Sequence, residues 1–234
     1  MKHVFIVGSK GIPTKYGGFE TFVDKLTEYK KSDQIQYHVS AIQDNDDYNP
    51  DKVTYEYNGA HCFNIKQRIN SAAKAIFYDV DSIKYSLNYI KKNQIEDFVI
   101  YVLACRIGPY IRKYKRKIHK LGGKLYVNPD GHEWKRSKWN KWIRRYWKHS
   151  EKKMVKHADL LICDSQGIEN FPLDSDSYIT GEIEYYDDFS TALNWGNYGN
   201  KYKHLEFTSG AKGSDSRPVF VKDQLLICNG SANE

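Results

Sequence analysis

The hydrophobic residues of this chain fall into two alternating patterns. Short runs of β-branched and aromatic residues are typical of strands covered on both faces, and they occur at 3–8, 37–42, 53–65, 97–104, 124–128 and 159–163. Longer segments with helical spacing of apolar residues lie between them, at about 18–30, 71–92, 108–121 and 138–157. The run at 53–65 is long enough to be a pair of strands or one strand with a bulge.

This order of elements predicts an α/β fold with a Rossmann-like, mostly parallel, doubly wound sheet. In such sheets ligands bind in the crevice at the carboxyl ends of the strands. The loops that follow the strands are therefore the first places to look for functional residues.

The character of the chain changes near Gly167. The net charge of +7 comes from the part before this residue, whereas the part after it is acidic and rich in Asp, Tyr, Asn, Ser and Gly. We expect one domain over 1–167 and an unassigned acidic tail over 168–234. Strand-like runs at 178–186 and 218–228 predict that the tail is a short, partly ordered C-terminal appendage.

Cysteine usage and hydrophobic segments indicate a cytoplasmic protein. The four cysteines are scattered, with no CxxC pair and no disulfide-dense framework. The apolar run before Gly8 is too short for a signal peptide. The longest apolar run, 98–105, is far shorter than a membrane span. We expect any membrane association to be peripheral.

The first strand is followed by "GSKGIPTKYGGFETF" at 8–22, which links it to the first helix. A helix that begins near Gly17 and Gly18 would direct its free N–H groups at the crevice, where they stabilise an anion. The spacing matches neither the dinucleotide fingerprint nor a P-loop. A purely structural loop, with glycines for tight packing, is the alternative.

Three segments carry a family resemblance: "VFIVGSKGIPTKYGGFETFVDKL" at the start, "YVNPDGHEWKRSKW" at 126–139 and "ADLLICDSQGIENF" at 158–171. Together they resemble bacterial sugar transferases of glycosyltransferase family 4, in particular rhamnosyltransferases of capsule and polysaccharide assembly. The resemblance covers residues 1 to about 170. It implies the N-terminal, acceptor-side half of a GT-B fold, in which two Rossmann-type domains face each other across a cleft.

The resemblance also implies the reaction and its substrates. The sugar would come from a nucleotide diphosphate donor of the dTDP-rhamnose class, which is a substrate, so no cofactor is expected. The acceptor would be a saccharide on a polyprenyl diphosphate, at the inner face of the cell membrane. The glycine-loop residues implied to approach these substrates are Gly11, Gly17, Gly18, Phe19 and Glu20.

The second segment offers catalytic candidates directly after a strand. We expect His132 to bind or polarise an acceptor hydroxyl, with Asp130 and Glu133 as further catalytic residues, and Trp134 to stack on a sugar. Arg106, after the strand at 97–104, is a candidate for phosphate contact. The alternatives are a simple turn at 130–131 and an ordinary surface arginine.

The segment 134–156 is rich in Lys, Arg and Trp. On a helix, Trp139, Trp142, Ile143 and Tyr146 form an aromatic stripe flanked by positive charge, which suits an anionic membrane surface. The alternative is that the stripe packs on the sheet and the cations are merely solvated. The residues expected to contact the membrane are Trp139, Trp142, Lys141, Arg144, Arg145 and Lys148.

Two other interpretations have less support in the sequence. Basic residues among aromatics also suit nucleic acid, but the chain has no helix-turn-helix, RNP-like or zinc-knuckle motif, so no nucleic-acid partner is expected. Asp-x-Asp triplets at 44–46, 79–81 and 174–176 occur readily by chance, so no metal site is expected. The alternative to a working glycosyltransferase is a truncated, inactive, membrane-associated binding module.

Overall fold

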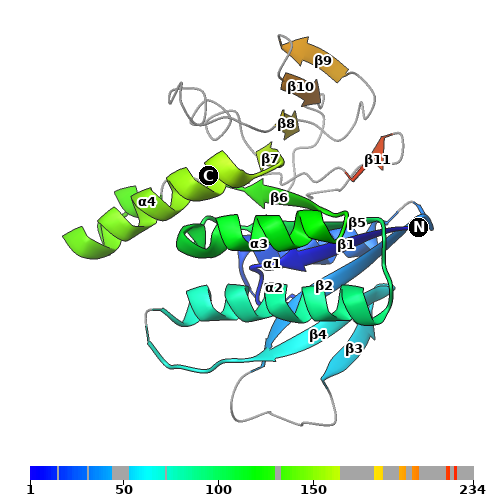
Figure 1. The fold of residues 1–234 in the computed structure, drawn as a ribbon, viewed down its shortest axis with the longest axis horizontal. Helices are drawn as coiled ribbons and strands as arrows, with labels where there is room; N and C mark the ends of the chain where they lie inside the picture. The colour runs from blue at the N-terminus through cyan, green and yellow to red at the C-terminus, as the bar shows by residue number, and fades with distance from the viewer. Residues whose placement is uncertain are drawn as a thin grey trace.

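The computed structural model describes residues 1–14, 16–30, 32–43, 53–71, 73–129 and 133–163, together with the backbone of five short strands between 182 and 225. Its main sheet has the order β3-β4-β2-β1-β5-β6-β7-β8-β10-β9 (Figure 1). The strands of the first part are β1 Lys2–Val7, β2 Ile35–Gln43, β3 Thr54–Tyr57, β4 Ala60–Lys66, β5 Phe98–Leu103, β6 Lys124–Asn128 and β7 Leu160–Cys163.

The connections within this sheet confirm the predicted fold class. Strands β4, β2, β1, β5, β6 and β7 pair in parallel. The run at 53–65 is a pair of antiparallel strands, β3 and β4. They are joined by Asn58 and Gly59, both at positive φ, as a tight two-residue hairpin requires.

In the described part of the chain, four α-helices cover the sheet: α1 Gly18–Glu28, α2 Lys74–Lys92, α3 Gly108–Lys120 and α4 Lys141–His157. Every residue of β5 is buried, and its side chains alternate between two cores. Phe98, Ile100 and Val102 join the core under α2, α3 and α4. Val99, Tyr101 and Leu103 join the core under α1. The sheet is therefore covered on both faces, which explains the unbroken apolar runs.

Two helices begin later than the sequence pattern predicts. α2 starts at Lys74 rather than near 71, and α4 starts at Lys141 rather than near 138. The start of α4 is set by Asn140, whose side chain accepts a hydrogen bond from the N–H of Ile143. A short 3-10 helix, Glu133–Lys135, precedes it.

The tail contributes further strands: β8 Glu182–Tyr186, β9 Trp195–Tyr198, β10 Tyr202–Leu205, β11 Phe220–Val221 and β12 Gln224–Leu225. β8 lies within the expected run at 178–186 and continues the main sheet in parallel with β7. β11 and β12 lie within the run at 218–228. β9 and β10 were not predicted, because these short segments are largely polar. The expected boundary near Gly167 falls outside the described residues and stays a prediction.

No helix in the described part of the chain combines the length and the hydrophobicity that crossing a membrane requires.

A chain of three histidines crosses the neighbouring strands β1, β2 and β4. His3 Nδ1 lies 2.9 Å from His38 Nε2, and His38 Nδ1 lies 3.1 Å from His61 Nδ1. His38 also stacks on Phe5. The pKa of His38 is lowered to about 3, mainly by burial and also by the neighbouring His61 and His3.

We expect this buried chain to make the fold acid-sensitive. Because the pKa of His38 is lower in the folded than in the unfolded protein, the unfolded protein binds the extra proton below about pH 6.5. Stability is then lost progressively as pH falls towards 3. Between pH 7.5 and 5, His38 alone should cost about 2 kcal/mol. Urea unfolding at both pH values measures this loss. The prediction would be contradicted if a His38→Phe variant lost as much stability between pH 7.5 and 5 as the wild type does.

Candidate active site

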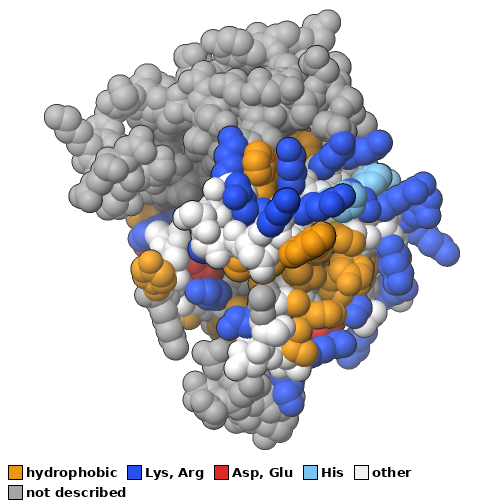
Figure 2. Space-filling model, turned by 90° about the vertical axis from the view of Figure 1, so that its left-hand side faces the viewer, with side chains coloured by type: hydrophobic (Ala, Val, Ile, Leu, Met, Phe, Trp, Pro, Cys, Tyr) orange, Lys and Arg blue, Asp and Glu red, His pale blue; other side chains and the backbone are white. Residues whose placement is uncertain are grey.

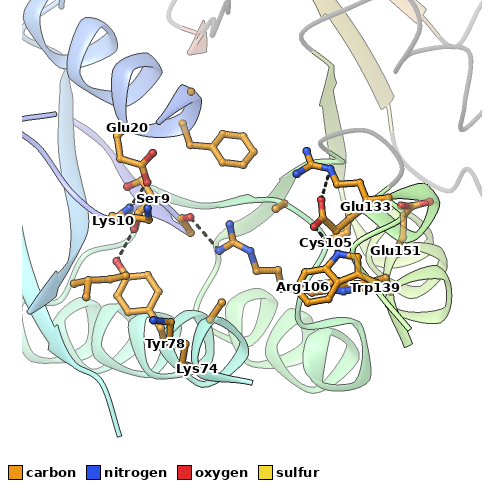
Figure 3. Close-up of a pocket in the computed structure, with 18 of the residues that line it drawn as sticks. Ser9, Lys10, Glu20, Lys74, Tyr78, Cys105, Arg106, Glu133, Trp139 and Glu151 are labelled. Atoms are coloured by element: carbon orange, nitrogen blue, oxygen red, sulfur yellow. Dashed lines mark hydrogen bonds and ion pairs between the residues drawn. The ribbon is translucent and has the colours of Figure 1, made fainter. Parts of the chain in front are cut away.

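A cavity of about 560 Å³ opens at the carboxyl ends of β1, β5 and β6. One wall consists of the β1–α1 loop and the starts of α1 and α2, and the other of the segment after β6 together with α4 (Figure 3). Among the described residues, five basic and three acidic side chains line it, so this part of the lining is cationic. They are Lys10, Lys74, Arg106, Arg136 and Lys138, with Glu20, Glu133 and Glu151.

The β1–α1 loop is held by hydrogen bonds to its backbone carbonyls. Arg106 donates to Gly8, the Tyr78 hydroxyl to Ser9, the backbone N–H of Ile42 to Lys10 and the Tyr55 hydroxyl to Ile12. The partial negative charges of these four carbonyl oxygens are therefore directed at donor groups of the protein. What the loop adds to the cavity is the Ser9 hydroxyl, a fully buried group with no hydrogen-bond partner among the described residues.

The start of α1 opens onto the same cavity. Gly18, Phe19 and Glu20 line it, and no side chain among the described residues caps this helix end. Three of the predicted substrate-binding residues therefore lie together where a helix dipole favours an anion. The Glu20 carboxylate accepts a hydrogen bond from the N–H of Lys10 at 2.7 Å, which ties the loop to the helix start.

The glycines of this loop divide into structural and open positions. A Cβ at Gly11 would lie 2.5 Å from the Cβ of Ala41, and one at Gly17 would overlap the Glu20 carboxylate. Both have positive φ, and neither lines the cavity. Close packing therefore accounts for both glycines, and their expected contact with substrate stays a prediction. At Gly18 a Cβ would meet nothing within 4 Å, so this glycine leaves open space at the cavity wall.

Arg106 lies between the two walls, as expected from its place after β5 (Figure 3). Its Nη1 lies 3.3 Å from both carboxylate oxygens of Asp79 and donates to Gly8 at 3.1 Å. Its own carbonyl accepts a hydrogen bond from the Tyr146 hydroxyl. Burial raises the pKa of Asp79 to about 6, while the adjacent Arg106 acts in the opposite direction.

The second wall is aromatic, but with different residues from the one predicted. Trp134 does not line the cavity: its indole N–H donates to Glu151, and Lys148 lies over its ring. Trp139 and Trp147 line it instead, with ring centroids 6.1 Å apart. The buried indole N–H of Trp147 has no hydrogen-bond partner among the described residues.

Glu133 lies at the cavity, but its carboxylate is already engaged. Arg136 and Lys138 pair with it at 2.8 and 3.1 Å, and the Trp139 indole donates to it at 2.8 Å. A carboxylate held by these three donors is better suited to positioning Trp139 than to accepting a proton. Asp130 and His132, the other predicted catalytic residues, lie outside the described residues.

The expected membrane stripe is altered by the later start of α4. Trp139 precedes the helix and turns into the cavity wall, so it does not continue the stripe. Trp142 remains strongly exposed, at 77%. The four predicted basic residues, Lys141, Arg144, Arg145 and Lys148, are also exposed. Figure 2 shows Lys and Arg side chains gathered on this side of the molecule, with hydrophobic side chains between them.

Several lining residues were not predicted from the sequence: Ser9, Lys10, Lys74, Tyr78 and Trp147. Ser9 and Lys10 belong to the loop that drew attention through its glycines. Lys74 and Tyr78 lie on α2, where a helical pattern does not reveal which loop the helix packs against. No group of side chains suited to a metal ion occurs in the described ranges.

Comparisons with known proteins extend this picture. A family model described as "Domain of unknown function (DUF1972)" matches residues 1–187. No curated protein matches the chain. Among solved structures, sucrose-phosphate synthase from Thermosynechococcus elongatus matches with a TM-score of 0.60 and 12% identity, covering 82% of this chain and 51% of that one. This likeness confirms the α/β fold of one half of a GT-B protein.

A second match, titled "Trehalose-6-phosphate from E. coli bound with UDP-2-fluoro glucose", has a TM-score of 0.47 and 9% identity and covers 84% of this chain and 52% of that chain. The chain thus spans about half the length of the solved structures that it matches.

Proposed function

This chain belongs to the DUF1972 family, and we propose that it is the acceptor-side half of a glycosyltransferase. The transfer would move a sugar from a nucleotide diphosphate to a hydroxyl group of an acceptor. The observation that carries the proposal is the cationic cavity at the carboxyl ends of the strands, into which the uncapped start of α1 opens.

The loop wall suits a phosphate group. The start of α1, Lys10, Lys74 and the Ser9 hydroxyl, which has no hydrogen-bond partner among the described residues, line this wall. A nucleoside diphosphate leaves with its negative charge, and preorganised donors of this kind stabilise such a charge without a metal ion. The loop wall could hold the diphosphate of the donor or that of the acceptor.

The aromatic wall suits a sugar. Trp139 and Trp147 line the cavity, and the buried indole N–H of Trp147 has no hydrogen-bond partner among the described residues. A sugar ring offers C–H groups to an aromatic face and hydroxyl oxygens to such a donor. The acceptor oxygen would attack the anomeric carbon while the bond to the nucleotide breaks and a base removes the hydroxyl proton. We propose Asp130 and His132 for that last task.

The finer assignment is rhamnosyl transfer in cell-surface polysaccharide assembly. It rests on the sequence resemblance to family 4 rhamnosyltransferases, which proposes a dTDP-rhamnose-class donor and a saccharide on polyprenyl diphosphate. The membrane-associated binding module is the second candidate, because α4 presents the exposed Trp142 among exposed basic side chains.

Radiolabelled sugar transfer to a polyprenyl-diphosphate-linked saccharide tests the proposal. With a donor-binding domain supplied in cis or in trans, we expect transfer, whereas residues 1–234 alone should bind the acceptor with little turnover. Robust activity of the isolated chain would contradict the assignment to one half of the enzyme. Acceptor binding without any transfer by the complemented protein would favour the binding module.

We also propose that α4 attaches the protein to the inner, anionic face of the cell membrane. The exposed indole of Trp142 and the cations around it form the contact. Replacing Lys141, Arg144, Arg145 and Lys148 with glutamine should release the protein from anionic liposomes, because each basic residue near the surface contributes about 1 kcal/mol. The wild-type affinity should fall as salt rises.

A matched variant controls for total charge. Lys2, Lys91, Lys92 and Lys124 lie at the opposite, amino-terminal edge of the parallel strands, near the start of β1, the end of α2 and the start of β6. Replacing these four with glutamine should leave liposome binding nearly unchanged. Equal losses in both quadruple variants would show that net charge, and not this face, governs binding.

A further inference from the structure

Arg106 is held by groups from three separate elements. Asp79 comes from α2, the Gly8 carbonyl from the β1–α1 loop, and the Tyr146 hydroxyl from α4. The guanidinium group is the part that reaches the cavity, and its side chain is 20% exposed, whereas that of Asp79 is completely buried. Figure 3 shows the side chain crossing towards the loop wall, with a dashed line to it.

Asp79 has no place in the proposed reaction, yet its burial is costly. A carboxylate removed from water loses its hydration, and only a close partner offsets that loss. Among the described residues, Arg106 is the basic side chain that pairs with it. The effect of Asp79 on a ligand must therefore pass through the orientation and the charge of Arg106.

We propose that Asp79 is a positioning residue that directs Arg106 at a phosphate group in the cavity and, on taking up a proton, strengthens the binding of that group. This inference rests on the proposed function, since it assumes that the cavity holds a phosphate-bearing substrate. It adds a residue outside the cavity and a pH dependence to that function.

Among the described residues, the ionisable groups that interact with Asp79 are Arg106, Tyr78 and Tyr146, and Asp79 is the one of these that titrates near neutral pH. Arg106 stays charged. Tyr78, its neighbour on α2, has a pKa raised by burial, and burial raises the pKa of Tyr146 on α4 to about 12. The pKa of Asp79, raised by burial to about 6, lies within the range in which proteins are ordinarily studied.

The direction of the effect follows from the charges. Above about pH 6 the ionised Asp79 neutralises much of the field of Arg106, so an anion in the cavity meets a weaker attraction. Below about pH 6 the protonated carboxyl still accepts a hydrogen bond from Arg106, but the positive charge is no longer offset. Affinity for an anion should therefore rise as pH falls, and by linkage the bound anion should promote protonation of Asp79.

Sulfate is a suitable probe, because its charge is constant between pH 5 and 8. We expect the full chain to bind sulfate roughly tenfold more tightly at pH 5 than at pH 8, measured by NMR titration, an effect of the size that one charge exerts across several ångströms. Asp79→Asn, which keeps the shape but not the charge, should bind at both pH values about as tightly as the wild type does at pH 5.

Asp81→Asn is the matched control. Asp81 lies two residues further along α2, pairs with Arg68 and Lys84, and does not line the cavity. This variant should keep the wild-type pH dependence. Arg106→Gln should bind weakly at both pH values and lose the difference between them, which provides a second test if Asp79→Asn does not fold.

The outcomes separate this inference from the proposed function. Tight sulfate binding in the cavity with the same pH dependence in wild type and Asp79→Asn would overturn the role of Asp79 alone. A pH dependence that survives in Arg106→Gln would do the same. No sulfate binding to the cavity at any pH would overturn the anion site, and with it both proposals.

Discussion

Valine at position 18 should abolish sugar transfer while leaving the fold intact. A Cβ at Gly18 meets nothing within 4 Å, and the residue has an ordinary helical backbone, so the larger side chain extends into the cavity rather than into the protein. It would occupy the space in front of the free N–H groups of α1. We expect transfer by the complemented enzyme to fall about 100-fold or more, because displacing a substrate by about 1 Å already has effects of that size.

Gly17→Val provides the contrast. There the Cβ would overlap the Glu20 carboxylate, and φ of +122° is strained for any residue with a side chain. This variant should lose thermal stability, whereas Gly18→Val should melt within a few degrees of the wild type. A stable Gly18→Val protein with full transfer activity would remove Gly18 from the proposed site.

Replacing Gly108 with valine should strongly destabilise the packing of α3 against α4. A Cβ at Gly108 would lie 2.2–2.7 Å from backbone atoms of Ser150, so α3 and α4 could not approach as they do. The Ser150 hydroxyl bridges the same contact, accepting from the N–H of Gly108 and donating to the carbonyl of Cys105. Because backbone atoms cannot move aside as a side chain can, we expect a loss of about 3 kcal/mol or more.

Two variants calibrate this loss. Ser150→Ala removes the two hydrogen bonds without a clash and should cost about 2 kcal/mol. Lys113→Ala, on the exposed face of α3, should change stability by less than about 0.5 kcal/mol. Urea unfolding of the three variants ranks them by their free energy of unfolding. A Gly108→Val protein as stable as Lys113→Ala would mean that the two helices do not pack in this way.

Local pattern alone predicts the succession of strands and α-helices in the described part of residues 1–163. Each strand is a short apolar run and each helix a longer amphipathic one, and both periods are properties of neighbouring residues. The antiparallel turn at Asn58 and Gly59 follows from its own two residues. The start of α4 was misplaced because the pattern before Lys141 looks helical, while the capping hydrogen bond of Asn140 decides where the helix begins.

The predicted residues that line the cavity are mainly those that follow a strand. Gly18, Phe19, Glu20 and Arg106 follow strands, and the carboxyl ends of parallel strands share one edge. The sequence did not indicate that Trp139 and Trp147, and not Trp134, line the cavity. Several tryptophans lie close together in the sequence, and only packing decides which of them reach the cavity.

The sequence by itself determined the succession of strands and helices and the placing of the glycine loop at a strand end, since these depend on residues close together along the chain. Only the tertiary structure decided that Gly17 packs while Gly18 lies open. It also decided that Asp79 on α2 holds Arg106, which donates to the carbonyl of Gly8, 98 residues away in sequence. The physical reason is that hydrophobic periodicity specifies which face of a helix is buried, whereas the partner of a buried polar group is specified by the packing of distant elements.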